Sequence, residues 1–205
     1  MIQKYIIKKN HPKLLLFFAG WACDETPFQS YNPTEMDYMI CYDYRTMDFD
    51  YTVFQQYEWI GVVAWSMGVW AAGYVLNKVN KFQGISIAFN GTGRPYDNLY
   101  GIPENIFTET LKHLSPANLQ RFMRRICGSG SAYRKFMEVT PRRNFTEVKD
   151  ELQAVLDTIH DHQNNPQEFE WNYHKAVLSK EDAIFPVNNM ERYFQLNKKI
   201  QIYIL

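Results

Sequence analysis

The chain lacks the features that define several large classes of protein. Its 205 residues contain no apolar run near the length of about 18 residues that crosses a membrane, and the run 14–19 is only as long as a strand. Lys plus Arg and Asp plus Glu both number 22, so the formal net charge is zero. These absences argue against a membrane protein and against a general nucleic-acid-binding protein.

Cysteines and targeting signals are also scarce. The three cysteines, Cys23, Cys41 and Cys127, fit neither a disulfide framework nor a CxxC site. Residues 1–13 lack the apolar core and the small-residue cleavage site of a secretory signal. We therefore expect the protein to act in the reducing cytoplasm, and we expect it to use no metal and no cofactor.

Apolar and aromatic side chains are abundant. They account for 46% and 16% of the residues, which predicts a single globular domain over residues 1–205 with a large core. Seven strands are predicted, at Lys4–Lys8, Leu14–Phe18, Tyr38–Tyr42, Trp59–Ala64, Phe82–Phe89, Ala176–Leu178 and Ile200–Leu205. Helical stretches separate most of them from Val69 onward, which predicts an α/β fold with a mostly parallel, doubly wound sheet.

Helical segments interrupt this alternation at about residues 91–174. Ser115 and Pro116 predict the start of a helix that ends at Cys127, and residues 145–160 carry apolar side chains at helical spacing. Ligands of open α/β sheets bind at the carboxyl ends of the strands. We therefore expect this insertion to form a helical cap over that edge of the sheet.

The most informative segment is IGVVAWSMGVWAAG, at residues 60–73. Ser66 stands between an apolar strand and an apolar helix, with the small residues Ala64 and Gly68 two positions to either side. This pattern is typical of the nucleophile elbow of α/β-hydrolases, in which a tight turn lifts a serine hydroxyl clear of the sheet. A buried serine in an ordinary strand-to-helix turn is the alternative.

A serine hydrolase also needs N–H donors that bind the oxyanion of the tetrahedral intermediate. In the α/β-hydrolase fold one donor is the residue after the nucleophile, here Met67, and the other lies in a loop after an early strand. Gly20 lets the backbone of that loop come close, so the N–H of Trp21 is the second candidate. A glycine turn followed by a core tryptophan is the alternative.

Asp182 is the candidate for the carboxylate that orients a catalytic histidine. It follows the predicted strand 176–178, although the neighbouring Glu181 is also a carboxylate, and a helix-capping role for Asp182 is the alternative.

The histidine itself is missing from the expected place, because every histidine precedes Asp182; they are His11, His113, His160, His162 and His174. His160 and His162 could bind a metal ion, but without further ligands a solvated helix end is favoured. We expect the natural chain to continue past Leu205 and to carry the histidine within a few residues.

Five segments of the chain together match one known family. They are FAGWACDETPF (18–28), YDYR (42–45), AWSMGVWAA (64–72), FNGTGRPYDNLYGIP (89–103) and EDAIFP (181–186). In this combination the chain resembles, over nearly its whole length, the BioG family of pimeloyl-[acyl-carrier-protein] methyl ester esterases.

The resemblance implies an α/β-hydrolase that removes the methyl ester from pimeloyl-carrier protein during synthesis of the biotin precursor. It implies Ser66 as nucleophile, Asp182 as acid, and Trp21 and Met67 as oxyanion donors. The chain departs from the family pattern at Ala22, where glycine is expected, and in the missing histidine after the final strand.

The resemblance also implies an acyl carrier protein as partner. A carrier protein is acidic, so basic side chains are expected near the mouth of the site. Five arginines are candidates for docking it: Arg121, Arg124, Arg125, Arg142 and Arg143. A solvated polar helix face is the alternative, and the oligomeric state is not indicated.

Two other functions fit the same residues. One is a serine hydrolase of different specificity, such as a thioesterase or a short-chain esterase. The other is a non-catalytic relative that binds an acyl carrier, which only the missing histidine supports.

Overall fold

The fold is built on one seven-stranded sheet. The computed structural model describes residues 1–79, 82–164 and 171–205. The strand order is β1-β3-β2-β4-β5-β6-β7. The strands are β1 (Ile2–Ile7), β2 (Lys13–Phe18), β3 (Asp37–Tyr42), β4 (Trp59–Trp65), β5 (Gly84–Phe89), β6 (Lys175–Leu178) and β7 (Gln201–Ile204). Each of the seven predicted strands is present.

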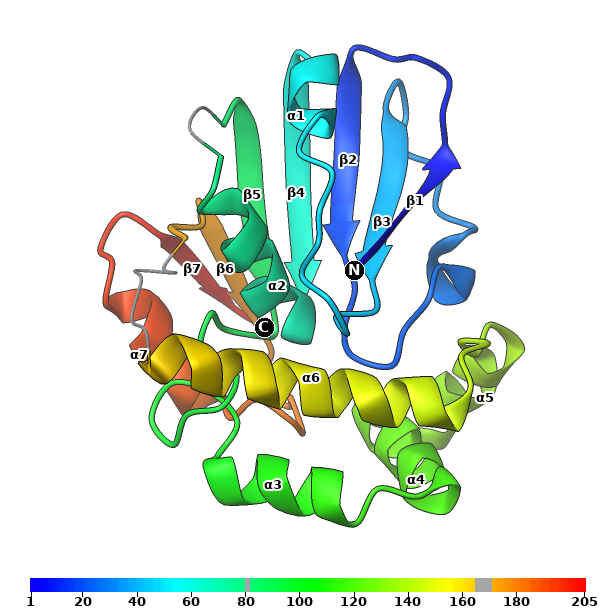
Figure 1. The fold of residues 1–205 in the computed structure, drawn as a ribbon, viewed down its shortest axis with the longest axis vertical. Coiled ribbons are helices and arrows are strands. Elements are labelled where there is room, and N and C mark those ends of the chain that lie inside the picture. Colours follow the sequence, from blue (N-terminus) through cyan, green and yellow to red (C-terminus); the bar gives the residue numbers. More distant parts are fainter. Residues whose placement is uncertain (80–81, 165–170) are drawn as a thin grey trace.

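The sheet is mostly parallel, as predicted. Of the described strands, β1 alone runs antiparallel to its neighbour, β3, whereas the pairs from β3 through β7 are parallel. The carboxyl ends of these parallel strands therefore point toward the same end of the molecule (Figure 1). Polar groups that follow these strands meet at that edge.

The apolar strand sequences are explained by burial on both faces. Every residue of β3 is buried, and the core continues through Leu14, Leu16 and Phe18 of β2 and Val62 of β4. Helix α2 (Met67–Leu76) packs against β4 and β2, and nine of its ten residues are buried. Short η1 (Thr26–Phe28) and α1 (Val53–Gln56) lie in connections, and α7 (Val187–Gln195) packs against β6. Burial of this kind is the main favourable term for the fold.

Four helices lie between β5 and β6, and we call them the cap helices. They are α3 (Glu104–Lys112), α4 (Pro116–Ile126), α5 (Gly130–Glu138) and α6 (Phe145–Asn164). Figure 1 shows α6 running across the carboxyl edge of the sheet, with α3 and α4 on its far side from the strands. The predicted start of α4 is confirmed, because the Ser115 side chain accepts a hydrogen bond from the Asn118 N–H. Helix α5 was not predicted.

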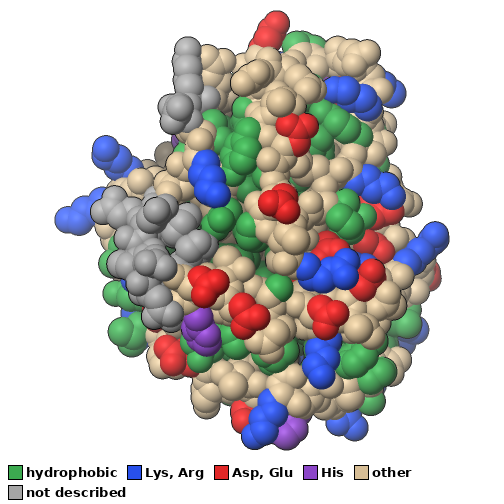
Figure 2. Space-filling model, in the orientation of Figure 1, with side chains coloured by type: hydrophobic (Ala, Val, Ile, Leu, Met, Phe, Trp, Pro, Cys, Tyr) green, Lys and Arg blue, Asp and Glu red, His purple; other side chains and the backbone are tan. Residues whose placement is uncertain are grey.

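No charge of one sign dominates the face of the molecule drawn in Figure 2. On the face drawn in Figure 2, Lys and Arg side chains are interspersed with Asp and Glu. Within residues 1–79, 82–164 and 171–205, we find no helix whose length and apolar character would suit a membrane crossing.

Candidate active site

Ser66 occupies the strained turn that the sequence predicts. Strand β4 ends at Trp65 and α2 begins at Met67, so Ser66 is the single residue between them. Its φ of 56° and ψ of −125° lie in a region that side-chain-bearing residues rarely adopt. The conformation is held because the Ser66 N–H donates to the Phe89 carbonyl at 2.9 Å and the Ser66 carbonyl accepts from Val69 at 3.0 Å.

Close backbone contacts explain the small residues around this turn. A Cβ on Gly68 would lie 2.3 Å from the Phe18 carbonyl oxygen, so α2 can approach β2 only with glycine there. A Cβ on Gly91 would lie 2.2 Å from the Ser66 carbonyl oxygen. The role of Gly68 was predicted, but that of Gly91 was missed because the loop after β5 meets the turn only through the tertiary fold.

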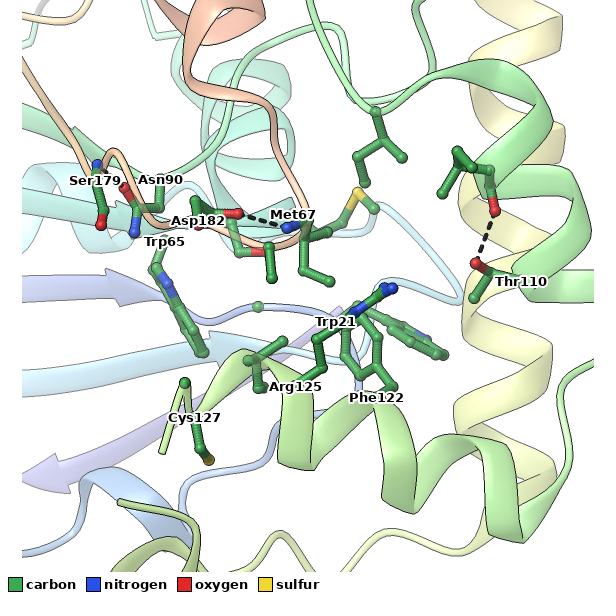
Figure 3. Close-up of a pocket in the computed structure, with 18 of the residues that line it drawn as sticks. Trp21, Trp65, Met67, Asn90, Thr110, Phe122, Arg125, Cys127, Ser179 and Asp182 are labelled. Carbon is green, nitrogen blue, oxygen red and sulfur yellow. Dashed lines mark hydrogen bonds between the residues drawn. The ribbon is translucent and has the colours of Figure 1, made fainter. Parts of the chain in front are cut away.

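A cavity of about 280 Å³ opens beside Ser66. Gly20, Trp21, Ser66, Met67 and Asp182 line it, and Figure 3 shows Trp21, Met67 and Asp182 among the lining side chains. The cap helices contribute Ile106, Phe107 and Thr110 from α3, Phe122, Arg125 and Ile126 from α4, and Leu152 from α6. The sequence-predicted Ser66, Asp182, Trp21 and Met67 therefore line one cavity under a largely apolar cover.

Two backbone N–H groups in this cavity are available to bind an oxyanion. Met67 is the first residue of α2, where a helix leaves its N–H groups without partners inside the helix. Trp21 lies in the loop after β2, and Gly20 beside it brings the backbone close to Ser66: a Cβ on Gly20 would be 3.3 Å from the Ser66 Cβ. The indole of Trp21 packs edge-on against Phe122 of α4, with ring centroids 5.0 Å apart.

Asp182 is fixed by its own backbone loop. Its Oδ1 accepts hydrogen bonds from the N–H of Ile184 at 2.8 Å and of Phe185 at 2.7 Å. Burial raises the pKa of Asp182 above its ordinary value, although these two N–H donors oppose the shift. Asp182 does not cap a helix, because α7 begins at Val187 with Pro186 as its N-cap and without a side-chain cap. The neighbouring Glu181 also lines the cavity but is exposed.

The histidines with described side chains lie elsewhere. His113 faces Glu109 at 3.0 Å in a neighbouring groove, His160 packs against Tyr96, and the Nδ1 of His174 lies 3.0 Å from the Ser86 hydroxyl. In the part of the chain that the structure describes, no histidine lines the cavity and no three His, Cys, Asp or Glu side chains gather as a metal site. The side chain of His162 lies outside the described residues.

The end of β7 lies close to the Asp182 loop. Leu205 donates its N–H to the Leu178 carbonyl at 2.8 Å, and its own carbonyl accepts from Lys180 at 3.0 Å. Lys180 is two residues before Asp182, so the chain at Leu205 is at the carboxyl edge where the cavity opens.

The five candidate docking arginines do not share one environment. Arg121, Arg124, Arg125 and Arg142 are exposed, and Arg121 and Arg125 line a second groove of about 400 Å³ between α3 and α4. The prediction for Arg143 was wrong. Its side chain is only 6% exposed and pairs with Glu151 at 2.5 Å and Asp43 at 3.1 Å, so it faces inward and is unavailable to a partner.

The chain is similar in sequence and in fold to several known proteins. The family model described as pimeloyl-ACP methyl esterase BioG matches residues 1–203. A solved structure of BioG from Haemophilus influenzae is 32% identical, covers all of this chain and 92% of that one, and superposes with a TM-score of 0.88. A lipase-esterase related protein from Clostridium acetobutylicum is 17% identical with a TM-score of 0.66, covering all of this chain and 89% of that one.

A longer relative is also similar. A Bacteroides fragilis protein named malonyl-[acyl-carrier protein] O-methyltransferase is 50% identical over 181 residues, which are 88% of this chain but only 36% of that protein. The chain thus spans about a third of that relative. The sheet, its helices and these structural neighbours together give the chain the α/β-hydrolase fold. Since the family model covers nearly every residue, the chain belongs to the BioG family.

Proposed function

We propose that this protein is a serine carboxylesterase that hydrolyses the methyl ester of pimeloyl-[acyl-carrier protein]. The observation that carries the proposal is Ser66 on a strained turn, in one cavity with Trp21, Met67 and Asp182. Membership of the BioG family supports the carrier-bound methyl ester as substrate. The name of the Bacteroides fragilis relative, which joins an acyl-carrier protein to methyl transfer, fits the same chemistry.

The proposed mechanism has two steps at the serine. A histidine base, which we propose follows β7, takes the Ser66 proton while the Ser66 Oγ attacks the ester carbonyl carbon. The N–H groups of Trp21 and Met67 bind the oxyanion that forms, an effect of about 3 kcal/mol for each donor. The histidine then protonates the departing methoxide, which leaves as methanol. Water hydrolyses the acyl-enzyme and releases the carboxylic acid.

The proposed position of the base follows from the strand pairing. Leu205 is hydrogen-bonded to Leu178 and Lys180, beside the loop that carries Asp182. A histidine a few residues further on would begin beside this loop, whose Asp182 lines the same cavity as Ser66. The carboxylate of Asp182 would hold the imidazole in the required tautomer and stabilise its charged form.

Selectivity for the methyl end would come from the cap helices. The cap helices line the cavity with apolar side chains, including Ile106, Phe107 and Leu152, which suit a methylene chain. The acyl thioester at the far end of the substrate would remain outside this cavity. The cap would thus bring only the methyl ester to Ser66.

The direct test is an assay on pimeloyl methyl ester attached to its carrier protein. The protein expressed from its complete gene is expected to release methanol and free carboxylate while the thioester stays intact, as mass spectrometry of the carrier would show. Cleavage of the thioester in place of the ester would indicate a thioesterase. No turnover of any ester, together with no labelling of Ser66 by a fluorophosphonate, would indicate a non-catalytic binding protein.

Arg121 provides a test of carrier docking. It is exposed on α4, lines the groove beside the cavity and is outside the cavity itself. We expect Arg121→Glu to lower kcat/KM for the carrier-bound ester about tenfold at low salt, because charge complementarity accelerates association. Turnover of p-nitrophenyl acetate should change less than twofold.

Arg134→Glu is the matched control for that variant. Arg134 is exposed on α5 and lines neither the cavity nor the groove, so its reversal makes the same change of net charge at a different place. Equal losses in the two variants, or equal losses on both substrates, would contradict a docking role for Arg121.

A further inference from the structure

One short stretch of the chain holds the whole loop that carries the Trp21 N–H. Four consecutive residues of this loop are each bonded to segment 142–151, which includes the start of α6. The indole of Trp21 donates to the Val148 carbonyl at 2.9 Å, the Ala22 N–H to Glu151 at 3.2 Å, the Arg143 guanidinium to the Cys23 carbonyl at 3.4 Å, and the Arg142 N–H to Asp24 at 2.6 Å.

Glu151 is the centre of these contacts. It is fully buried, with 0% exposure. Its Oε1 accepts from the Tyr44 N–H at 2.9 Å, and its Oε2 accepts from the Ala22 N–H and from the Arg143 guanidinium at 2.5 Å. Glu151 therefore joins the loops that follow β2 and β3. Burial raises the pKa of Glu151, and the Arg143 charge opposes that shift.

The residue that Glu151 holds is itself strained. Ala22 has a φ of 67°, in the left-handed region that favours glycine. Such a conformation persists only where surrounding contacts enforce it. The N–H that Glu151 binds belongs to the peptide immediately after Trp21, so this contact fixes the backbone on one side of the Trp21 N–H. On the other side, Gly20 lies close to Ser66.

Arg143 in turn fixes Glu151. Its guanidinium contacts Glu151 and lies 3.1 Å from Asp43, and Asp43 is held by Arg45 through bonds of 2.8 Å and 2.6 Å. Arg143 therefore balances the charge of a buried carboxylate that would otherwise be costly to maintain. Trp21 lines the cavity, whereas the groups that hold its loop, Ala22, Glu151, Arg143 and Asp43, are not among the described residues that line it.

We propose that Glu151, held by Arg143, is a positioning residue that keeps the Trp21 N–H aimed at the developing oxyanion. The proposal rests on the proposed function, because it takes the Trp21 N–H as an oxyanion donor. Glu151 acts through the backbone and touches no substrate. A shift of one donor weakens transition-state binding while substrate binding in the apolar cavity is preserved.

Glu151→Gln tests the proposal. An amide has one acceptor and one donor group, so in either orientation its NH₂ faces a backbone N–H, of Ala22 or of Tyr44. For p-nitrophenyl acetate we expect kcat to fall about tenfold to a hundredfold with KM changed less than threefold. Whichever backbone amide loses its acceptor, that of Ala22 or that of Tyr44, should also exchange faster with deuterium. Asp150→Asn, at an exposed position of α6 directly beside Glu151, is the control expected to keep wild-type kinetics.

A structural anchor would give a different result. In that case folded Glu151→Gln protein would have a lower melting temperature but a kcat within twofold of wild type, and the proposal would be overturned. If Glu151→Gln does not fold, Arg143→Lys decides the question, because it keeps the charge but loses the planar contact with Glu151 and Cys23. A several-fold fall in its kcat at constant KM supports the proposal, and wild-type kcat overturns it.

A failure of the proposed esterase function can be distinguished from a failure of the proposed role of Glu151. If the wild-type protein is neither labelled by a fluorophosphonate at Ser66 nor active on any ester, the proposed esterase and the positioning role both fall. If the wild type is labelled and active but both variants retain its kcat, only the role of Glu151 falls.

Discussion

Replacing Ser66 with alanine is expected to lower kcat for ester hydrolysis by about a million-fold, as loss of the nucleophile does in a serine protease. Alanine removes the attacking oxygen and nothing else that holds the turn. The Ser66 N–H bond to Phe89 and the carbonyl bond from Val69 are both backbone interactions, so they remain. The melting temperature should therefore stay close to that of the wild type.

Ser179→Ala is the matched control for this variant. Ser179 lines the same cavity, and its hydroxyl accepts a hydrogen bond from the Glu181 N–H. Its loss should cost only a few-fold in kcat. Hydrolysis of p-nitrophenyl acetate and labelling by a fluorophosphonate would be measured for both variants. Labelling that survives in Ser66→Ala but disappears in Ser179→Ala would show that the nucleophile has been assigned to the wrong serine.

Asp182→Asn is expected to lower kcat by about 10⁴-fold, as removal of the charge does in other serine triads. The amide oxygen of asparagine can keep the two bonds from Ile184 and Phe185, so the loop should retain its shape. The NH₂ group, however, would face the imidazole with a donor where an acceptor is needed, and the charge that stabilises the imidazolium would be lost.

Glu181→Gln separates the two neighbouring carboxylates. Glu181 is exposed on the same loop, and we expect its neutralisation to cost no more than about threefold in kcat. A large loss of kcat in Glu181→Gln, with little loss in Asp182→Asn, would show that Glu181 and not Asp182 is the carboxylate that orients the histidine.

The acid side of the pH profile gives a second check on Asp182. Burial raises its pKa, so as the pH falls the side chain takes up a proton earlier than an exposed aspartate does. Protonation removes the required charge. Any fall in kcat that protonation of Asp182 causes should therefore occur at a pH above the ordinary pKa of aspartate, and it should be absent in Asp182→Asn.

The sheet was predictable because its signals are local. Parallel strands buried on both faces are continuous apolar runs, and each run is bounded by a turn residue or a charge. The start of α4 was predicted for the same reason, since Ser115 caps the helix with its own side chain. The strained turn at Ser66 was predictable because such a turn needs small residues at fixed spacing, which a single sequence displays.

The errors concern properties that depend on distant residues. Arg142 and Arg143 look alike in the sequence, yet Glu151 and Asp43, which lie far from each other in the chain, bury Arg143 and leave Arg142 exposed.

Helix α5 was missed although its signal was present: Ser129 caps it by accepting a hydrogen bond from Ala132. Glu151 has no sequence signal, because a glutamate within a helix is usually solvated.

The contacts of segment 142–151 divide the cap helices into two parts that differ in how freely their sequences can change. All residues of α4 and α5 are described and none of them is fully buried, whereas α6 contributes Val148, Glu151, Leu152 and Val155 to the interior. Residues 116–138 could therefore be exchanged between relatives, or recombined in the laboratory, to alter which acyl chains enter. Segment 142–151 would have to be inherited together with the loop at residues 20–24, since hydrogen bonds join the two at Trp21, Ala22, Cys23 and Asp24. Specificity in such a protein can diverge quickly while its chemistry stays constant.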